Sequence, residues 1–514
     1  MDATVVNAAF EGLSLVFSWP YFMYTIAGTL LAMLFSAVPG LNSSTLMALA
    51  IPLTIAWEPL PLMLVFGAFV GGATFMGSIT AILFNIPGKS QNAVTLLDGY
   101  PLTQQGMAKT AIGCAATSSA LGSTFGIFFL IGLIPFMREA AMALGPPEYL
   151  MLAIWGLTTL AALSGGSMLK GLIVAGLGLQ LALIGYDPRT AELRFTFGLD
   201  YLHDGLSLVP VFLGVFALAE VIDLMVSRKQ TLSGKHHIEE LTGSVWEGVQ
   251  SVFRHFGLFL RSSVIGTVIG AIPGVGSSVA GFVAYGHARQ TAGRASRFGR
   301  GDIRGLLAPE AANDAKDGGA LVPTLALGIP GGTGTAVLLG ALTLHGMNPG
   351  REMLTDNLVL VFVLIWSLFL SNWITSLLGL SLVNPMARLS TIRTTRLLPF
   401  IIALSVIGCL QFRGLMADVV CAVLFGLLGY LMKRHDWPRI PLAIAIVLAP
   451  LFETNLHLTL RLHELERIVF WTRPLVLVLI AMTLVNLFLP AISSRLNAKR
   501  QGQREGSSAG DESE

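Results

Sequence analysis

One short segment carries four charged side chains into an otherwise apolar sequence. The stretch from Pro309 to Gly319 reads PEAANDAKDGG, and at helical spacing Glu310, Asp314 and Asp317 would share one face. Acidic groups next to a membrane cavity can bind cations or carry protons. The residues alone leave three interpretations open: a Na⁺ site, a cap for the helix that follows, or a solvated turn.

Four Pro-Gly breaks interrupt long apolar runs, at Pro39, Pro87, Pro273 and Pro330. Proline removes a backbone donor and glycine relaxes the chain, so a helix must stop at each break. The free N–H and C=O groups of such helix ends cannot face lipid, and we expect them to face a cavity. Helix N-termini suit a carboxylate, whereas the opposite ends offer carbonyls to Na⁺. Ordinary kinks or interfacial loops are the alternative, but loops would carry more charge than these hydroxyl- and amide-rich breaks.

The breaks and the acidic segment together define a candidate site. We expect substrate binding by small polar and backbone groups at the breaks, namely Gly40, Asn42, Ser43, Ser44, Thr45, Asn85, Pro87, Gly88, Lys89, Ser90, Gly274, Gly276, Ser277, Ser278, Gly331, Gly332 and Thr333. We expect ion coupling by Asn85, Glu310, Asn313, Asp314, Asp317 and Gly328. Two roles stay open for Lys89: it presents a positive charge to an anionic substrate, or it extends to water as lysines at a membrane boundary do.

Two collinear matches indicate an internal duplication. Ala37–Ser44 (AVPGLNSS) aligns with Ala271–Ser278 (AIPGVGSS) at an offset of 234 residues. Asn85–Gly88 (NIPG) aligns with Gly328–Gly331 (GIPG) at an offset of 243 residues. Internal repeats are typical of transporters, whose sites lie between discontinuous helices at the repeat interface. The pattern therefore predicts two repeats with re-entrant helices around one shared site.

The composition decides what kind of elements position these residues. Of the 514 residues 54% are hydrophobic and only 12% charged, and the mean hydropathy is +0.72, whereas soluble domains carry about 25% charged residues. Stretches such as Leu206–Val226, Asn357–Leu382 and Ile468–Leu489 are long enough to cross a bilayer core of about 30 Å as helices. Lipid cannot satisfy bare backbone groups, and the alternation of a membrane barrel is absent. We expect an all-α, polytopic transmembrane protein with about ten to thirteen spans.

The chain divides into five parts by composition. They are an N-terminal interfacial segment (1–17), a first transmembrane repeat half (18–230), a charged connecting loop (231–255), a second transmembrane repeat half (256–491) and a disordered polar tail (492–514). Basic residues concentrate in 289–304, 433–439 and 495–504, which the positive-inside rule places in the cytoplasm. The basic loop has no aromatic or groove-reading motif, which argues against nucleic-acid binding.

Patterns typical of enzymes fail on inspection. The glycine-rich stretch Gly328–Thr335 lacks the lysine of a phosphate-binding loop, and no strand precedes it. None of the histidines has HExxH spacing, and the three cysteines lie in apolar stretches without a CxxC pattern. We expect no catalytic residues, no structural metal and no cofactor apart from a coupling ion. Gly122 and Gly126 have the GxxxG spacing that lets membrane helices approach closely.

These motifs together resemble the large membrane subunit of the tripartite tricarboxylate transporter family. The similar stretches are PGLNSSTLMALAIPLT, GSITAILFNIPGKSQNAVTLLDGYPLTQQG, AIPGVGSS, APEAANDAKDGGALVPTLALGIPGG and TAVLLGALTLHGMNPG. The resemblance covers roughly residues 10 to 490, and the glycine-rich motifs of the family fall on the four breaks. Departures from the family pattern are Asn42, where glycine is usual, Lys89, where an acidic residue is common, and Asp314, where asparagine is usual.

The resemblance implies the permease of a secondary uptake system in the bacterial inner membrane. Such a permease works with a small membrane subunit of about four spans and a periplasmic solute-binding protein, and imports citrate or another carboxylate with Na⁺ or H⁺. A stand-alone ion-coupled permease is the alternative, which neighbouring reading frames would decide. A membrane-embedded enzyme is the remote alternative, and it would need a catalytic constellation inside the membrane that the sequence lacks.

Overall fold

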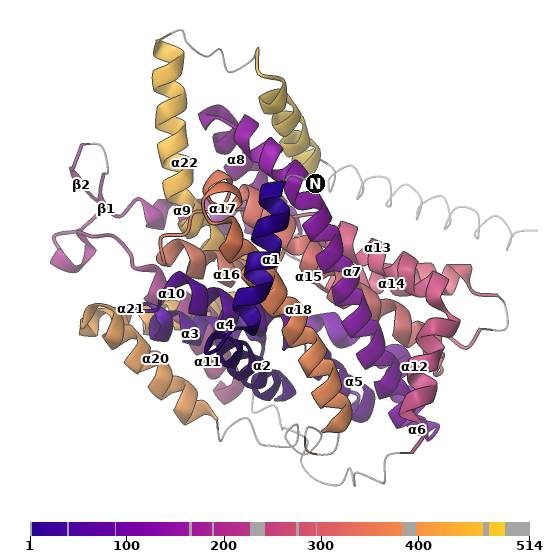
Figure 1. Ribbon diagram of the computed structural model, residues 1–514. Coiled ribbons are helices and arrows are strands. Elements are labelled where there is room, and N and C mark those ends of the chain that lie inside the picture. The colour runs from indigo at the N-terminus through magenta and orange to yellow at the C-terminus, as the bar shows by residue number, and fades with distance from the viewer. Residues whose placement is uncertain are drawn as a thin grey trace, which may run out of the picture. The chain divides into compact units, whose positions relative to one another are not determined.

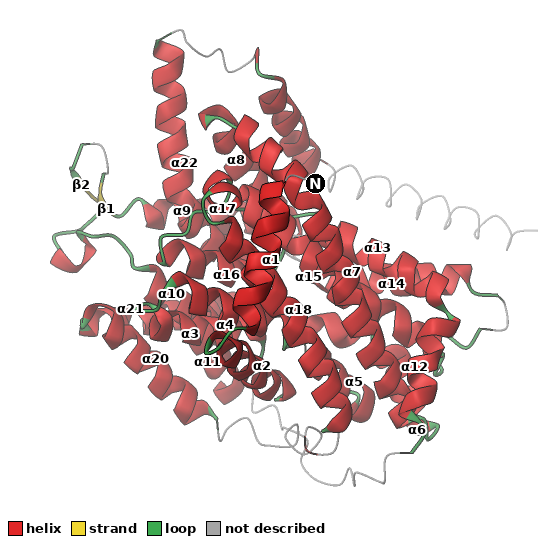
Figure 2. Ribbon diagram, viewed as in Figure 1, coloured by secondary structure: helices red, strands yellow, loops and turns green. Residues whose placement is uncertain are grey.

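The computed structural model describes residues 3–38, 41–87, 89–163, 167–187, 190–226, 242–273, 277–293, 296–382, 385, 397–465 and 472–488. Over these residues the regular elements are helices and one two-stranded antiparallel ladder, in which Gly185–Tyr186 (β1) pairs with Leu193–Arg194 (β2), and loops connect them, as Figure 2 shows. The all-α class is confirmed.

Two compact units are formed. The first comprises Met1–Ala143 and Leu183–His435. Its helices before the ladder are α1 (Ala3–Phe17), α2 (Tyr21–Ala37), α3 (Ser43–Thr54), α4 (Pro59–Gly71), α5 (Thr74–Phe84), the 3₁₀ turn η1 (Ser90–Ala93), α6 (Leu96–Gln104) and α7 (Ala108–Ala143). Those after it are η2 (Asp200–Leu202), α10 (Leu208–Phe212), the π-helical segment η3 (Leu213–Leu218), α11 (Ala219–Val226), α12 (Val245–Arg254), α13 (Phe256–Ala271), α14 (Ser277–Thr291), α15 (Ile303–Leu327), α16 (Thr333–Leu344), α17 (Arg351–Thr355), α18 (Leu358–Ser381), α20 (Leu398–Arg413) and α21 (Met416–Arg434).

The second unit comprises Leu144–Ala182 and Asp436–Glu514. Its described helices are α8 (Pro146–Leu163), α9 (Met168–Ala182), α22 (Ile440–Glu464) and a further apolar helix, Pro474–Phe488. Glu148 of α8 is buried and lies 2.7 Å from the guanidinium of Arg473, so a charge pair joins the two stretches of this unit.

Six helices are long and apolar enough to cross a membrane, and up to eight spans result if each of two bent helix pairs counts as one. Five further apolar helices have only 10–17 residues. These counts cover the described residues and are lower than the ten to thirteen spans expected, because several apolar stretches are divided by breaks into helices too short to span a bilayer of about 30 Å.

Both bent pairs lie directly before a Pro-Gly break. α1 meets α2 at 75°, and α12 meets α13 at 80°. Residues 245–254, expected in a charged connecting loop, form α12 because Ser244 caps its N-terminus by accepting a hydrogen bond from the Glu247 amide. α1, expected at the membrane interface, packs against α18, where Trp366 donates a hydrogen bond to the Ala9 carbonyl.

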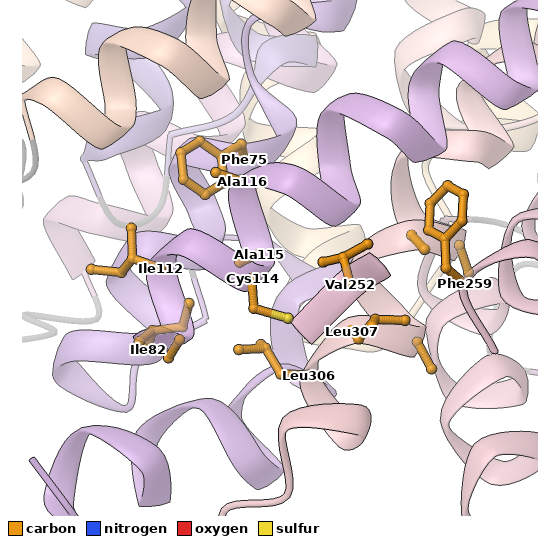
Figure 3. Packing of buried hydrophobic residues seen from close by; sticks show 14 of the residues in the cluster. Phe75, Ile82, Ile112, Cys114, Ala115, Ala116, Val252, Phe259, Leu306 and Leu307 are labelled. Carbon is orange, nitrogen blue, oxygen red and sulfur yellow. The ribbon is translucent and has the colours of Figure 1, made fainter. Parts of the chain in front are cut away.

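The core of the first unit lies where α5, α7, α12, α13 and α15 meet. Figure 3 shows Cys114 and Val252 beside Leu306 and Leu307 in this apolar cluster. α15 runs through the middle of the unit, in contact with α7, α13 and α14 (Figure 1). Polar side chains on α15 are therefore surrounded by protein rather than by lipid.

Small residues let α7 and α15 approach closely, as the GxxxG spacing predicted. A methyl group on Gly122 would lie 2.4 Å from the Ala311 carbonyl oxygen, and one on Gly126 would lie 2.2 Å from that of Ala315. No side chain of any size fits between the two backbones at these points.

One buried carboxylate fixes the loop that leads into α15. Asp98 lies inside α6, and its Oδ1 accepts hydrogen bonds of 2.8–2.9 Å from the amides of Gly299, Gly301 and Asp302. Its Oδ2 accepts one of 2.9 Å from the Tyr285 hydroxyl. The segment Asp98–Pro101 is thus helical, and Asp98 anchors the basic loop that leads into α15.

Candidate functional site: helix breaks around a buried acidic face

The first and third breaks end and begin their helices at equivalent positions. α2 ends at Ala37 and α13 at Ala271, and each is followed by an extended residue, Val38 or Ile272. α3 then begins at Ser43 and α14 at Ser277. All these positions are separated by 234 residues, the offset of the sequence match, which supports the duplication.

The second and fourth breaks repeat in the same way at an offset of 243. α5 ends at Phe84 and α15 at Leu327. The next residues, Asn85 and Gly328, both adopt the left-handed conformation, with φ of 56° and 69°. Glycine and asparagine adopt it at least cost, and it is a common way to end a helix. The left-handed conformation therefore explains both the asparagine and the glycine at these equivalent positions.

Elements that follow the breaks contact each other across the two halves of the chain. α3, after the first break, packs on α16, after the fourth. α14, after the third, packs on η1, after the second. A ring nitrogen of His345, at the end of α16, lies 2.8 Å from the carbonyl oxygen of Thr54, at the end of α3. The four breaks are thus paired first with fourth and second with third.

Three of the breaks come close to α15. Gly270, just before the third break, packs on α15 so tightly that a methyl group there would lie 2.2 Å from the Lys316 carbonyl oxygen. Gly331, in the fourth break, lies against Ala320 one turn further along. Lys89, after the second break, interacts electrostatically with Asp317, Lys316 and Asp314.

Glu310 is fully buried and is held by uncharged donors. Its Oε2 accepts a hydrogen bond of 2.7 Å from Ser78 on α5, and its Oε1 accepts one of 2.5 Å from Thr95, just before α6. Asn92 donates to Ser78 at 2.8 Å. The carboxylate of the second half is therefore bound by side chains of the first half.

Asp314, one turn along α15, is also fully buried. Its Oδ2 accepts a hydrogen bond of 2.6 Å from Ser119 on α7, and its Oδ1 accepts one of 2.9 Å from the Asn372 amide on α18. Burying a charge among neutral groups costs several kcal/mol, so groups of this kind are rare outside sites that bind ions or protons.

Asp317, a further turn along, has a charged partner. It forms an ion pair with Lys316, which is itself buried, and accepts a hydrogen bond of 3.3 Å from Thr74 on α5. Thr74 and Asp317 are 243 residues apart, the offset of the second match. Of the three acids on this face, Asp317 is the one with a lysine partner in the described part of the chain.

The remaining ion-coupling prediction on α15 also lies inside the protein. Asn313 is fully buried and donates a hydrogen bond of 3.0 Å to the Gln91 carbonyl oxygen. The interpretation of this segment as a solvated turn is wrong, because it lies in the middle of a buried 25-residue helix. It does not cap the following helix either, since Gly332 precedes α16 and its amide donates to Thr335 at 2.9 Å.

The predicted site residues at the breaks differ in how far they are buried and in their place at the helix ends. Asn42 caps α3 by accepting a hydrogen bond of 2.9 Å from the Thr45 amide, which gives it a structural role beside any binding role. Ser44, Thr45 and Gly331 are buried, Ser43, Lys89, Gly332 and Thr333 are half-buried, and Asn85 and Pro87 are exposed. Gly40, Gly88, Gly274 and Gly276 lie outside the described residues; Ser277 and Ser278 begin α14 and Ser90 begins η1.

Sequence reasoning missed the neutral partners of the acids. Ser78, Thr95, Ser119 and Asn372 contact Glu310 or Asp314 from positions 58 to 232 residues away in the chain. The only available signal was that each is a small polar residue within an apolar stretch. Such residues are common in membrane helices, so this signal does not identify partners.

Comparison with known proteins identifies the family of the chain. Residues 22–444 match the family model described as the tripartite tricarboxylate transporter TctA family. The chain belongs to this family. It is similar to an uncharacterised 52.8 kDa protein in the TAR-I ttuC' 3' region of Agrobacterium vitis, with 31% identity over 476 residues, 92% of this chain and 94% of that protein. An uncharacterised protein in the TAR-II ttuC' 3' region of the same organism is 31% identical over 235 residues, 46% of this chain and 97% of its own. No solved structure matches the chain.

Membership of the TctA family determines the general class of the protein. It is a multi-pass membrane protein and a transporter subunit, and the family is not a family of enzymes. The family name implies a tripartite system, in which this TctA-family chain works with other subunits.

Proposed function

We propose that this TctA-family protein is the permease of a binding-protein-dependent secondary transporter that imports a carboxylate, a tricarboxylate such as citrate or a related organic acid, with Na⁺ or H⁺. Its partners are a small membrane subunit of about four spans and a periplasmic solute-binding protein, and its place is the bacterial inner membrane. The substrate binds at the helix ends formed by the four breaks, and the coupling ion binds at the acidic face of α15.

The observation that carries this proposal is the joining of the two halves at α15. Helix ends at equivalent positions of the two halves lie beside this helix, and Glu310 is bound by Ser78 and Thr95 of the first half. A movement of one half against the other would break these bonds. Occupancy of the acidic face and the arrangement of the breaks are therefore linked.

The charge of the substrate explains why a coupling ion is needed. Each charge that crosses the membrane potential is worth about 2.3 kcal/mol per 100 mV, so a trianion moving inward costs about 7 kcal/mol. One cation per substrate charge cancels this cost. Two carboxylates with neutral partners, Glu310 and Asp314, are available for cations or protons.

Uptake of labelled citrate and related carboxylates into membrane vesicles tests the proposal. Vesicles with the permease and the small subunit are measured with and without the binding protein, under a Na⁺ gradient or a proton gradient. Uptake should require the binding protein and one of the gradients. Unchanged uptake after both gradients are removed would refute ion coupling, and full uptake without the binding protein would favour the stand-alone permease.

A single substitution tests the acidic face in the same vesicles. Glu310→Gln keeps the size of the side chain and both hydroxyl neighbours but removes the negative charge. We expect at least about a tenfold loss of ion-driven uptake, because a hydrogen bond or ion contact to a charged group is worth about 1.5–3 kcal/mol. Glu58→Gln, at the exposed N-terminus of α4, is the matched control. Equal uptake by both variants would remove Glu310 from the coupling site.

A further inference from the structure

Three oxygen atoms on α7 and α18, on or near the residues that bind Asp314, take part in no hydrogen bond within the described part of the chain. Ser123 lies one turn after Ser119 on α7, and Ser376 lies one turn after Asn372 on α18. Asn372 Oδ1, Ser123 Oγ and Ser376 Oγ are buried and have no hydrogen-bond partner among the described residues. Their side chains are only 2 to 3% exposed. A buried polar atom without a partner costs about 1–3 kcal/mol, which a ligand that contacts all three atoms would offset.

The orientation of the Asn372 amide follows from its neighbour. Carboxylate oxygens only accept hydrogen bonds unless they are protonated, so the atom 2.9 Å from Asp314 Oδ1 must be the amide nitrogen. The unpartnered atom is therefore the amide oxygen. It lies on the same small amide group and hence next to the carboxylate.

The contacts between α7 and α18 bring the two serines toward the same place. Phe128 packs on Trp366 and Phe369, whereas Thr124 accepts a hydrogen bond from Trp373, so the two helices run antiparallel. In an antiparallel pair, a step back along α7 corresponds to a step forward along α18. One turn beyond the Thr124–Trp373 contact, Ser119 therefore lies near the level of Ser376, and Ser123 lies near the level of Asn372. Ser123 and Ser376 are thus each one helical turn from a residue that binds Asp314, Ser119 on α7 and Asn372 on α18.

Hydroxyl groups elsewhere on these two helices are satisfied. On α7, Thr117 and Thr124 donate to the carbonyl oxygens of the preceding turn at 2.8 and 2.7 Å. On α18, Ser367 and Ser371 donate to carbonyl oxygens of α4 at 2.5 and 2.8 Å. Ser123 and Ser376 thus differ from their neighbours in that neither the backbone nor another side chain uses their hydroxyl.

We propose that Asp314, Asn372, Ser123 and Ser376 form a binding site for a Na⁺ ion. One carboxylate, one amide oxygen and two hydroxyl oxygens are hard neutral or anionic ligands, which suit a hard cation and not an anion. This set holds one carboxylate, whereas divalent ions in all-protein sites usually take several. The proposal rests on the proposed function, because it makes Na⁺ the coupling ion, and it adds ligands from α7 and α18.

Direct binding of ²²Na⁺ to the purified full-length protein tests this site without transport. We expect saturable binding that Li⁺ competes for better than K⁺. Ser123→Ala and Ser376→Ala should each weaken Na⁺ binding about tenfold or more, since each removes one ligand to a charged ion. Neither should lower stability in Na⁺-free buffer, because each removes a hydroxyl that has no partner within the described chain. Added Na⁺ should raise the unfolding temperature of the wild type more than that of either variant.

Ser262→Ala is the matched control. Ser262 is also a fully buried serine whose hydroxyl has no partner among the described residues, but it lies on α13. Na⁺ binding should be unchanged in this variant. Wild-type affinity in both Ser123→Ala and Ser376→Ala, or an equal loss in Ser262→Ala, would overturn the proposed site.

The same samples separate this site from the proposed function. If the wild type binds no Na⁺ but vesicles take up a carboxylate under a proton gradient, the Na⁺ site is wrong and the permease proposal stands. If Na⁺ binds and depends on Ser123 and Ser376 but no carboxylate is taken up with all three subunits present, the site stands and the permease proposal is wrong.

Discussion

Alanine substitutions at two glycines of α7 should have opposite effects. Gly126 faces α15, and a methyl group there would lie 2.2 Å from the Ala315 carbonyl oxygen and 3.0 Å from its Cα. Carbon and oxygen atoms in close contact are normally about 3.3–3.6 Å apart, so α7 and α15 would have to separate by about 1 Å. Gly132, on the same helix, has no atom within 4 Å of the added methyl group.

The size of the difference follows from comparing the two variants. Alanine favours a helix over glycine by about 0.5–1 kcal/mol, and this gain is common to both. Overpacking at Gly126 costs about 1–3 kcal/mol and has no counterpart at Gly132. Gly126→Ala should therefore be less stable than Gly132→Ala by about 1–3 kcal/mol, and Gly132→Ala should be at least as stable as the wild type.

Denaturant titration of the purified protein in mixed micelles, followed by tryptophan fluorescence, measures this difference. The wild type and both variants are compared at one protein and detergent concentration. Coincident unfolding curves for Gly126→Ala and Gly132→Ala would refute the close contact between α7 and α15. A stabilised Gly126→Ala would refute it as well.

Substitutions at two further positions, Asn85 and Asp98, test the backbone roles given to these residues. Asn85→Gly should leave stability unchanged, whereas Asn85→Ala should cost about 1 kcal/mol, because the residue has a φ of 56°; equal thermal unfolding of the two variants would contradict the left-handed helix end. Asp98→Ala should cost about 3 kcal/mol or more, because three backbone amides lose their acceptor, and should make the basic loop at 296–302 sensitive to trypsin. Asp98→Asn retains one oxygen for these amides and should cost less; a loop as resistant in Asp98→Ala as in the wild type would exclude the anchoring role.

The helix ends around the breaks could be predicted from the sequence because their causes are local. A Pro-Gly pair directly follows each of these helices, so the ends at Ala37 and Ala271 follow from the nearby residues, whereas the single prolines Pro309 and Pro323 lie within α15. The common face of Glu310 and Asp314 is likewise local, since it depends only on helical spacing. The break pairing was not predictable, because it depends on which elements pack together after the chain folds.

The burial of the acidic face could not be predicted from the sequence for the same reason, because it depends on which helices pack around α15. A segment with four charges is typical of a solvated turn when it is viewed alone. Here α15 is enclosed by α7, α13 and α14, so Glu310 and Asp314 are buried. The partners of Asp314, Ser119 and Asn372, are distant in sequence and belong to a very common class of residue, so no local pattern connects them to Asp314.

The contact between Thr74 and Asp317 has a consequence for the symmetry of the carrier. Equivalent positions of two related halves can touch each other only at the axis that relates the halves, so this pair marks a pseudo-two-fold axis beside α15. In a carrier made of two identical halves, the residue at this place would meet its own copy. Two aspartates there would repel each other at close range, and two threonines would offer no charge. Divergence after duplication allows a hydroxyl on one side and a carboxylate on the other, so the two sides of the axis differ chemically.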